Sequence, residues 1–584
     1  MIIIHNQLTD IFPLSKEKFK IQIWIKKDYA KEVHLLYDDR YDMQNLKIEG
    51  MEHEVTVYDY NVYSVIIKPK TKRLGYKFII KDYNDKIFYY KQEGIATEDE
   101  LYFGHFHFPY VNESDIFLKP EYVEDLIVYE IFPDRFYKSP NYSVNKEFEP
   151  WDYKKWDKKG SEVFLGGNLR GIIEKIDYFK ELGINAIYLT PIYKSTTSHR
   201  YNVDDYYNVD PILGTNEDFK ELVNVMHKND IKVIIDMVFN HSGTNFYAFQ
   251  DLIKNGEKSK YSEWYNVYSY PINTKQINYE TFATNVREMP KLNTSNNEVQ
   301  DFIINVLKYW INEFEVDGIR FDVANELDKN LLRRIRKEIK SINKEILLIG
   351  EVMHRSENFL LGDMFDGVMN YYSWEIFIKY LLGRKGAKET ANNLSEYRLR
   401  INPLIFSCQL NLIGSHDTPR VYTLLGNKAL TRLATVFNLT YQGIPMIYYG
   451  DEILMEGHQD PDCRRGMIWD KERWDNDILW LYKRLIKLKK NINALKSDNV
   501  KEGYINDVFY FKREANDEFV YVFINANKDS KLINLFDLRL IGKEIYYFSK
   551  QKTEYNPFAN VSICVGGNDF EIIIASKNLN ELLL

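Results

Sequence analysis

The sequence predicts an α/β fold: a (β/α)8 (TIM) barrel with an N-terminal β-sandwich domain and a C-terminal antiparallel β domain. Two observations predict it. Between residues 125 and 450, eight short apolar runs alternate with helical patterns, as in a parallel sheet that closes into a barrel. On either side of that region, short strands with turn-like gaps replace the helices. A chain of 584 residues has room for three such units.

Residues 1–118 are expected to form the N-terminal sandwich. Phe19–Ile25 alternates apolar and polar residues for most of its length, the pattern of a strand with one buried face. Polar gaps separate it from further short strands, which favours a sandwich. Residues 108–115 break the pattern and are expected to be a linker. The other expected strands are Val33–Tyr37, Val55–Tyr58, Tyr63–Ile67 and Tyr76–Ile80.

Residues 119–495 are expected to form the barrel, with a short inserted domain (B domain) around 242–300. Leu169–Leu182 has a helical pattern that ends at Gly183, a glycine suited to a C-cap. Thr215 and Asp218 form a capping box before a helix at Phe219–His227, and Val299–Phe314 carries a helical apolar stripe. The eight expected strands are Leu126–Phe132, Ala186–Thr190, Val233–Ile235, Gly318–Phe321, Ile346–Ile349, Gly367–Met369, Gln409–Gly414 and Ile444–Tyr449.

Residues 496–584 are expected to form a C-terminal β-sandwich. Val508–Phe511 and Phe519–Ile524 flank Asn516-Asp517, which predicts a hairpin, and strands at Ser562–Val565 and Phe570–Ile574 follow.

Composition excludes several classes of protein. Apolar residues make up 45% and charged residues 28%, which excludes wholesale disorder. The net charge of −8 and the lack of a basic stripe argue against a nucleic-acid partner. Three cysteines without a CxxC pair argue against zinc and against a disulfide framework. No signal peptide or run of about 18 apolar residues is present. We therefore expect a cytoplasmic protein with no membrane partner.

Acidic residues gather where a barrel places its active site, at the carboxyl ends of the strands. Asp236 follows the third strand, Asp322 the fourth, Glu351 the fifth and Asp417 the seventh. A single acid at such a position is usually a cap or a loop residue. Four converging acids, with His241 and His416 beside them, indicate a site.

The spacing suggests the chemistry. Arg320 and Asp322 are two residues apart on a strand and share a face, so the arginine favours an ionised aspartate suited to a nucleophile. Glu351 leaves an apolar strand, and an apolar setting raises a carboxyl pKa and suits a general acid. Such a pair is what glycoside hydrolysis requires. A divalent-metal site is the weaker alternative, since no HxH or HExxH spacing occurs. No metal and no cofactor are expected in catalysis.

Four segments together resemble signature regions of the α-amylase family: Asp236-Met-Val-Phe-Asn240-His241, Gly318-Ile-Arg320-Phe-Asp322, Gly350-Glu351-Val-Met-His354 and Gly414-Ser-His416-Asp417. The junction at Phe108–Asp115 and Tyr129–Phe136 resembles the neopullulanase, cyclomaltodextrinase and maltogenic amylase subgroup. So do Met289-Pro-Lys-Leu-Asn293 and Val323-Ala-Asn325-Glu326.

The resemblance implies a role for each matching residue. Asp322 would be the nucleophile and Glu351 the acid and base, while Asp417 would hold hydroxyls of the distorted sugar beside Asp236, His241 and His416. Arg320 would hold Asp322. Tyr201 would be the platform under that sugar, and Asn325 and Glu326 would line the acceptor side. Asp460 and Arg464 would contact the next donor-side sugar, the alternative being a mere ion pair within the loop.

The sequence departs from the family at three places. Relatives supply calcium ligands from Asn-Gly-Asp and Gly-Gly-Asp, but the corresponding segments here are Lys138-Ser-Pro-Asn141 and Gly166-Gly-Asn168. Because a hard cation prefers charged oxygen ligands, we hypothesise that the protein needs no structural calcium. Asn202 stands where relatives usually have aspartate, and Met353 replaces the usual tryptophan after the acid.

The sequence therefore predicts an intracellular retaining hydrolase of α-1,4-glucosidic bonds in cyclodextrins and maltodextrins, with pullulan as a further substrate and some transglycosylation. α-Glucan oligosaccharides are the expected partners. The resemblance also implies a homodimer in which the sandwich narrows the neighbour's pocket, with a monomer as the alternative. An α-glucosidase or glucanotransferase on the same barrel is the alternative activity. A non-enzymatic carbohydrate-binding scaffold is the remote one, because all three acids are present.

Overall fold

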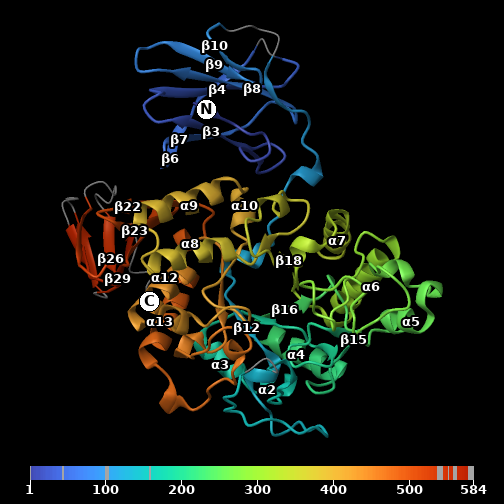
Figure 1. The fold of residues 1–584 in the computed structure, drawn as a ribbon. Helices are drawn as coiled ribbons and strands as arrows, with labels where there is room; N and C mark the ends of the chain where they lie inside the picture. Colours follow the sequence, from blue (N-terminus) through green and yellow to red (C-terminus); the bar gives the residue numbers. More distant parts are fainter. Residues whose placement is uncertain are drawn as a thin grey trace.

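The computed structural model describes residues 2–42, 45–98, 104–156, 160–535, 543–549, 552–556 and 562–576. Figure 1 shows the N-terminal strands in blue at the top, a central barrel with its helices, and the C-terminal strands in red at one side. The expected barrel, N-terminal β domain and C-terminal antiparallel sheet are all present. No helix within these residues has the length and apolar content needed to span a membrane.

The N-terminal region folds into two antiparallel sheets. All five strands expected from alternation are present, and the residues that they turn inward, such as Ile21, Leu35 and Phe78, are buried between the sheets. The strands are β1 (Ile3–Ile4), β2 (Ile11–Pro13), β3 (Phe19–Lys26), β4 (Glu32–Asp38), β5 (Lys47–Gly50), β6 (Glu52–Val57), β7 (Tyr60–Ile67), β8 (Leu74–Lys81), β9 (Ile87–Lys91), β10 (Gly94–Ala96) and β11 (Phe106–Phe108). One sheet has the order β1-β3-β7-β6 with β2 on β3; the other has β10-β9-β8-β4-β5 with β11 on β8.

Eight parallel strands form the barrel, and each overlaps a run that the sequence predicts. They are β12 (Val128–Ile131), β13 (Ala186–Leu189), β16 (Lys232–Met237), β17 (Gly318–Phe321), β18 (Leu347–Gly350), β19 (Gly367–Val368), β20 (Leu410–Asn411) and β21 (Ile444–Tyr448). Their order is β19-β18-β17-β16-β13-β12-β21-β20. A parallel bridge between Met369 and Leu410 joins the two ends of this row and closes the ring. Apart from the partly exposed Lys232, the residues of these strands are buried, because helices cover the outside.

The helices follow the predicted patterns with one difference. Gly183 ends a helix with a left-handed φ of 89°, and Thr215 and Asp218 make the expected capping box. The single helix expected over Leu169–Leu182 is two, because a 3₁₀-type bond from the Lys175 N–H to the Ile172 carbonyl ends the first one early. The helices are α1 (Pro133–Phe136), α2 (Leu169–Ile173), α3 (Ile176–Leu182), α4 (Asn216–Lys228), α5 (Tyr247–Asn255), α6 (Asn297–Phe314), α7 (Lys329–Ile342), α8 (Tyr371–Leu381), α9 (Ala387–Leu399), α10 (Pro403–Phe406), α11 (Val421–Leu425), α12 (Lys428–Thr440) and α13 (Asn476–Asn491).

The C-terminal region is a six-stranded antiparallel sheet with a second, two-stranded sheet. The predicted hairpin turns at Asn516, whose φ of 52° suits an asparagine. The strands are β22 (Val500–Ile505), β23 (Val508–Ala515), β24 (Glu518–Asn525), β25 (Lys531–Asn534), β26 (Lys543–Tyr547), β27 (Lys552–Asn556), β28 (Ser562–Val565) and β29 (Asp569–Ser576). The large sheet has the order β22-β23-β24-β29-β26-β27, and β25 pairs with β28.

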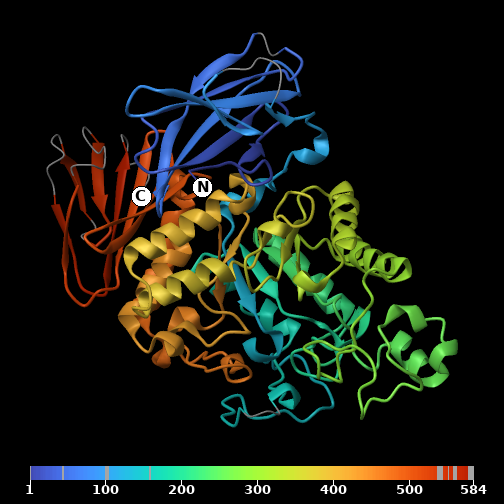
Figure 2. The same cartoon turned by 45° about the horizontal axis from the view of Figure 1, so that its top comes forward.

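Helix α9 is the place where all three parts of the chain meet (Figure 2). The buried Arg398 guanidinium on α9 donates to the Glu502 carboxylate of β22 over 2.9 and 3.0 Å. Its Nη1 also lies 3.7 Å from Glu54 of β6, which pairs with Lys20 of β3 at 2.9 Å. Although burial opposes it, Lys20 and Arg398 lower the pKa of Glu54 to about 2. One guanidinium therefore links the sandwich, the barrel and the C-terminal sheet.

Two excursions after the barrel strands shape the face at the carboxyl ends of those strands. After β13, a short hairpin of β14 (Tyr193–Ser195) and β15 (Val203–Val209) carries a loop that contains Tyr201. After β16, residues 242–296 make an irregular excursion with α5 before the chain returns in α6.

Candidate active site

A pocket of about 380 Å³ lies at the carboxyl ends of the barrel strands. Asp322 comes directly after β17 and Glu351 directly after β18, so neighbouring strands carry the two carboxyls to the same end of the barrel. Asp417 follows β20, and Tyr201 reaches the pocket from the loop before β15. The pocket thus gathers residues that are far apart in the sequence.

Arg320 binds three carboxylates at once. Its Nη1 donates to Asp322 Oδ1 at 2.9 Å and to both oxygens of Asp236 at 2.9 Å. Its Nη2 lies 3.0 Å from Oε1 of Glu351. The guanidinium is fully buried, so solvent hardly screens these interactions.

The two central carboxyls affect each other. Burial raises the pKa of Asp322 well above its ordinary value; Glu351 adds to the rise and Arg320 opposes it. Burial also raises the pKa of Glu351 against the charge of Arg320. The raised pKa of Glu351 agrees with the expectation from the sequence. The raised pKa of Asp322 does not, because burial and the neighbouring Glu351 outweigh Arg320, which the two carboxyls share. Two buried carboxyls that face one cation favour a state in which the pair keeps one proton.

Val323 positions Glu351 through a strained turn. Its φ of 45° and ψ of 43° put a β-branched residue in the left-handed region, which costs free energy. In this conformation the Val323 N–H donates to Glu351 Oε2 at 2.8 Å. The strain thus supplies a backbone donor to one carboxyl oxygen, while Arg320 contacts the other.

Asp417 lies in a chain of charged groups. Its Oδ2 lies 2.9 Å from His416 Nε2, and its Oδ1 accepts from Arg464 Nη2 at 2.9 Å. Although burial opposes it, His416 and Arg464 lower the pKa of Asp417. The other nitrogen of His416 binds the buried Glu130 of β12, and Asp417 and Glu130 together raise the pKa of His416 to about 10 against the effect of burial. His416 is therefore an imidazolium and Asp417 a carboxylate.

Three uncharged rings complete the pocket. The Tyr201 ring stacks on His416 at 5.5 Å with a 10° tilt, and its hydroxyl donates to Asp236 at 2.8 Å. Burial lowers the pKa of His241 to about 3, and its buried Nε2 has no protein partner in the described structure. Burial and Arg464 lower the pKa of His199, whose Nδ1 accepts from the Tyr201 N–H at 3.1 Å. Both histidines are neutral, so they can form hydrogen bonds with a hydroxyl without competing for charge.

A family model of the alpha amylase catalytic domain matches residues 130–536, and one of the alpha amylase N-terminal ig-like domain matches residues 1–112. The chain belongs to the alpha-amylase family. It is 41% identical over 541 residues to a cyclomaltodextrinase of Thermoanaerobacter pseudethanolicus, and the alignment covers 91% of this chain and 93% of that protein. It is 35% identical over 534 residues to neopullulanase 2 of Thermoactinomyces vulgaris, covering 90% of each.

A solved structure of a cyclomaltodextrinase matches the whole arrangement. The TM-score is 0.92 at 30% sequence identity, and the match covers 98% of this chain and 99% of the other. The fold is therefore shared from the sandwich to the C-terminal sheet. As a member of this family the protein is a glycoside hydrolase.

The structure places the expected alpha-amylase family residues in three groups. Asp236, Arg320 and His416 lie behind the pocket wall, and each contacts a residue that lines it. Glu326 lies outside the lining and pairs with Lys291 at 2.6 Å. Asp460 and Arg464 are an ion pair at 2.8 Å and also line the pocket. The expected residues in the lining are Tyr201, His241, Asp322, Asn325, Glu351, Asp417, Asp460 and Arg464.

Several residues of the site have no role assigned to them from the sequence, although Met289 and Val323 stand in segments that resemble the subgroup. His199, Phe282, Met289 and Val323 also line the pocket, and Phe282 lies 5.2 Å from the His241 ring. Glu130 lies behind the wall, bound to His416. Glu130 had a usable signal, since an acid within the apolar run Leu126–Phe132 must find a buried partner. His199 and Phe282 stand in loops, whose course depends on the rest of the fold.

Two of the departures from the family have clear structural consequences. The Asn202 side chain accepts from Ser195 Oγ at 2.7 Å and donates to Thr196 Oγ1 at 2.6 Å, so the amide fastens its own loop. Met353 lines the pocket with 44% of its surface exposed. A flexible thioether therefore forms part of the mouth in place of a rigid indole.

The segments that correspond to the family's calcium-binding segments make contacts within the protein. Asn168 caps α2 by accepting from the Gly171 N–H at 2.8 Å. Ser139 and Asn141 donate to the Glu174 carboxylate at 2.7 and 2.9 Å. Lys138 Nζ lies 4.5 Å from the Phe148 ring, which is a cation–π contact. Of these side chains only Glu174 is a carboxylate, whereas a hard cation prefers several charged oxygen ligands. Within the described residues no cluster of three or more His, Cys, Asp or Glu side chains could hold a metal.

Proposed function

We propose that the protein is a retaining hydrolase of α-1,4-glucosidic bonds in cyclodextrins and maltodextrins, that it also acts on pullulan, and that it transfers part of the released sugar to other sugars. The observation that carries the proposal is the contact of Asp322 and Glu351 with one guanidinium at the bottom of one pocket. This arrangement provides one ionised and one protonated carboxyl, and double displacement at a sugar requires such a pair, one as nucleophile and the other as acid and base.

The reaction follows from these positions. With the shared proton on Glu351, Asp322 is a carboxylate and attacks the anomeric carbon, while Glu351 protonates the departing glycosidic oxygen. A glycosyl ester of Asp322 results. Glu351, now a carboxylate, then takes a proton from water or from an acceptor hydroxyl that attacks the same carbon. Asp322 leaves as a carboxylate, and the configuration is retained.

The other residues hold the sugar during both steps. Asp417, kept ionised by His416 and Arg464, accepts hydrogen bonds from ring hydroxyls. His241 offers its unpartnered Nε2 to a hydroxyl as a neutral ring. Tyr201 lies under the sugar as an aromatic platform whose tilt is fixed by its stacking on His416. Asn325, exposed on the loop after Asp322, lines the acceptor side.

The names of two relatives support the substrate class. A cyclomaltodextrinase and a neopullulanase each align with at least 90% of this chain. The pocket's combination of aromatic and acidic side chains suits a neutral polyhydroxyl ligand.

We also propose a homodimer in which the sandwich of one protomer narrows the pocket of the other. Residues 2–118 contribute eleven of the twenty exposed large apolar side chains among the described residues, although they are about a fifth of the chain. Such a concentration favours a surface that a partner covers. Within one chain, none of the described residues that line the pocket comes from this domain. Gel filtration with light scattering tests the dimer, and a monomer at micromolar concentration would overturn it.

A cytoplasmic location is part of the proposal. All three cysteines of the chain, Cys408, Cys463 and Cys564, are unpaired, as is usual in a reducing compartment. Cell fractionation with an antibody to the protein tests this.

The deciding experiment measures reducing-sugar release from β-cyclodextrin, pullulan and soluble starch by the wild type and by Asp322→Asn. We expect cyclodextrin to be cleaved rapidly and the variant to lose activity by orders of magnitude. Activity on starch alone would move the protein to an amylase with an open cleft. No activity on any glucan with folded protein would contradict the proposal. With maltotriose, products longer than the substrate reveal transfer, and maltose cleavage would favour the α-glucosidase alternative.

A further inference from the structure

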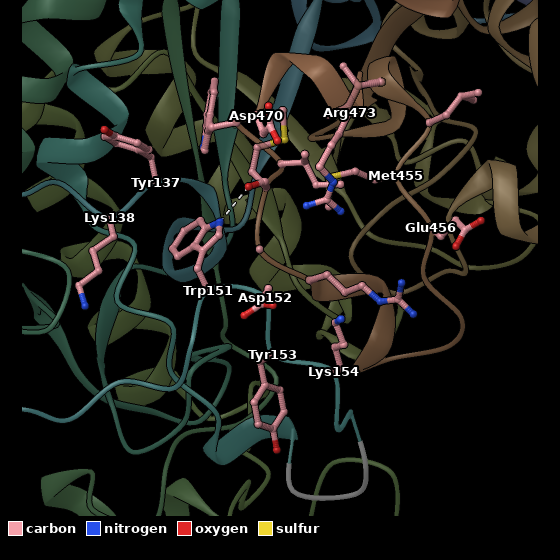
Figure 3. Close-up of a pocket in the computed structure, with 17 residues that line it drawn as sticks. Tyr137, Lys138, Trp151, Asp152, Tyr153, Lys154, Met455, Glu456, Asp470 and Arg473 are labelled. Carbon is pink, nitrogen blue, oxygen red and sulfur yellow. Dashed lines mark hydrogen bonds between the residues drawn. The ribbon is translucent and has the colours of Figure 1, made fainter. Parts of the chain in front are cut away.

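A second and larger pocket, of about 820 Å³, lies beside the catalytic one on the same face of the barrel. We call it the outer pocket. As Figure 3 shows, it is built by two segments of the chain, the stretch after α1 that includes Tyr137 and Trp151 and the stretch of residues 453–473 that follows β21. Its volume is that of a ligand site of ordinary size.

The outer pocket is distinct from the catalytic pocket, because the two share no lining residue. They do share a loop. Asp460 and Arg464 line the catalytic pocket, and Gly466 and Trp469, a few residues further, line the outer pocket. Arg464 also contacts Asp417 at 2.9 Å. Whatever occupies the outer pocket therefore touches the loop that carries the donor side of the catalytic site.

Aromatic rings line the outer pocket and are fixed before any ligand arrives. The Trp151 Nε1–H donates to the Met467 carbonyl at 2.8 Å, the bond drawn in Figure 3. The Trp469 Nε1–H donates to the Phe136 carbonyl at 2.6 Å. Lys175 Nζ lies 3.6 Å from the Tyr137 ring and 4.2 Å from the Trp469 ring, which fastens the two together. Rings that are already held lose little entropy when they bind the apolar face of a sugar.

The charges of the outer pocket favour a neutral ligand. Arg465 is neutralised by Asp462, to which it donates at 2.8 and 2.7 Å. The other charged residues of the lining are three cations and three carboxylates: Lys138, Lys154 and Arg473 against Asp152, Glu456 and Asp470. A site for a phosphate or a nucleotide would carry an excess of cations. Balanced charges around aromatic rings suit a polyhydroxyl ligand, which needs both donors and acceptors.

We propose that the outer pocket is a separate glucan-binding site that holds one part of a long α-glucan while another part is cleaved. The proposal rests on the proposed function for its ligand class. Since a chain held at one pocket is presented to the other at a high effective concentration, the outer pocket raises activity on long chains and leaves short substrates unaffected. A maltotriose is too short to occupy both pockets, whereas starch chains can.

The first test measures binding stoichiometry. In the Asp322→Asn background, which stops cleavage, isothermal titration with maltoheptaose is expected to show two sites per chain. Adding Trp151→Ala is expected to leave one site, with affinity at the outer pocket reduced about tenfold or more. Trp480→Ala is the matched control, because Trp480 is an exposed tryptophan on α13 outside both linings. A single binding site in the Asp322→Asn variant would overturn the proposal. Two sites that remain after Trp151→Ala is added would overturn it too.

A second variant guards against misfolding. Trp151 packs against Gly466, so its loss could disturb the loop. Tyr153→Ala removes another ring of the lining, one that contacts the Trp156 ring edge-on. We expect Tyr153→Ala also to weaken maltoheptaose binding at the outer pocket and to leave the melting temperature of the protein unchanged. Tighter binding of inorganic phosphate or ATP than of maltoheptaose at this pocket would overturn the glucan assignment.

Kinetics separate this proposal from the proposed function. In the otherwise wild-type enzyme, Trp151→Ala should lower kcat/KM on soluble starch about tenfold and leave kcat/KM on maltotriose unchanged. An equal loss on both substrates would indicate damage to the catalytic pocket and overturn the proposal. If the wild type cleaves maltotriose but the Asp322→Asn variant binds a single maltoheptaose per chain, only the outer-pocket proposal fails. If the wild type cleaves no glucan and the variant binds none, the proposed function fails as well.

Discussion

Nη2 of Arg320 lies 3.0 Å from Oε1 of Glu351, so the arginine that holds Asp322 holds the second carboxyl too. Register explains the contact: Arg320 on β17 pairs with Ile349 on β18, and Glu351 is two residues further along. Neither carboxyl therefore has a cation of its own, and the charge of the pair is decided jointly.

The pH profile should reflect this shared cation. In the proposed mechanism Asp322 must be ionised to attack, so a raised pKa of Asp322 moves the acid limb of kcat/KM to higher pH. Glu351 must be protonated to act as an acid, so its raised pKa moves the alkaline limb upward as well. We expect a bell-shaped profile with both limbs above the ordinary carboxyl pKa values of about 4. Initial rates on maltotriose across a series of buffers measure it, and an acid limb at an ordinary aspartate value would contradict the geometry.

Glu351→Gln should be rescued by azide. The variant lacks the proton for a poor leaving group, so kcat on maltotriose should fall by about 10²- to 10⁴-fold. With α-maltosyl fluoride, whose leaving group needs no proton, the glycosyl ester of Asp322 still forms. Azide then attacks without a base and releases α-maltosyl azide, which NMR identifies. Absence of the adduct, or a β-anomer, would show that Glu351 is not the acid and base of a double displacement.

Glu130→Gln should change how stability depends on pH. Asp417 and Glu130 raise the pKa of His416 from 6.5 to about 10 although burial opposes it. Because the folded state holds this proton more tightly, the stabilisation is fully present below the unfolded value and is lost as pH rises from 6.5 through about 10. Removing the Glu130 charge lowers the folded pKa and flattens this decline. Urea unfolding at several pH values measures it.

The control for that experiment is Glu472→Gln, which removes an exposed carboxylate that is not among the groups named as shifting the pKa of His416. It should leave the slope of unfolding free energy against pH unchanged. A slope in Glu130→Gln equal to that of the wild type would mean that Glu130 does not hold His416 charged.

Calcium removal should not destabilise the protein. In the segments that correspond to the family's calcium ligands, Asn168 caps α2, and Ser139 and Asn141 bind Glu174. We expect the melting temperature in EGTA to equal that in calcium. A fall in EGTA that calcium, but not magnesium, reverses would show a calcium site and refute the hypothesis.

Arg398→Met should destabilise the whole chain. The substitution leaves Glu502 and Glu54 buried without their shared cation, a loss of about 3–5 kcal/mol. Adding Glu502→Gln should restore part of it, because the uncompensated charge is removed. Lys379→Ala, which breaks an exposed pair with Glu375, should change stability by no more than about 0.5 kcal/mol. Chemical denaturation measures all three, and an Arg398 effect as small as the Lys379 effect would refute the role of the network.

The sequence predicts the scaffold well because local patterns determine it. Gly318–Phe321 is a strand in both the expectation and the structure, and the capping box at Thr215 begins α4 as expected. The four acids converge because a closed barrel brings every strand end to one face. The sharing of Arg320 with Glu351 is not predictable from spacing, since it depends on the register between β17 and β18, which pairs Arg320 with Ile349. His199 and the outer pocket depend on long loops, which carry no periodic signal.

The contacts of Arg398 with Glu54 and Glu502 limit how these domains can be exchanged between related proteins. A sandwich moved to another barrel would bring Glu54 with Lys20 but without the arginine between them and β22. A barrel without its C-terminal sheet would keep the arginine and lose its main acceptor. Viable chimaeras of this enzyme should therefore exchange β6, α9 and β22 together, and a recombination point placed within that trio should yield insoluble chains.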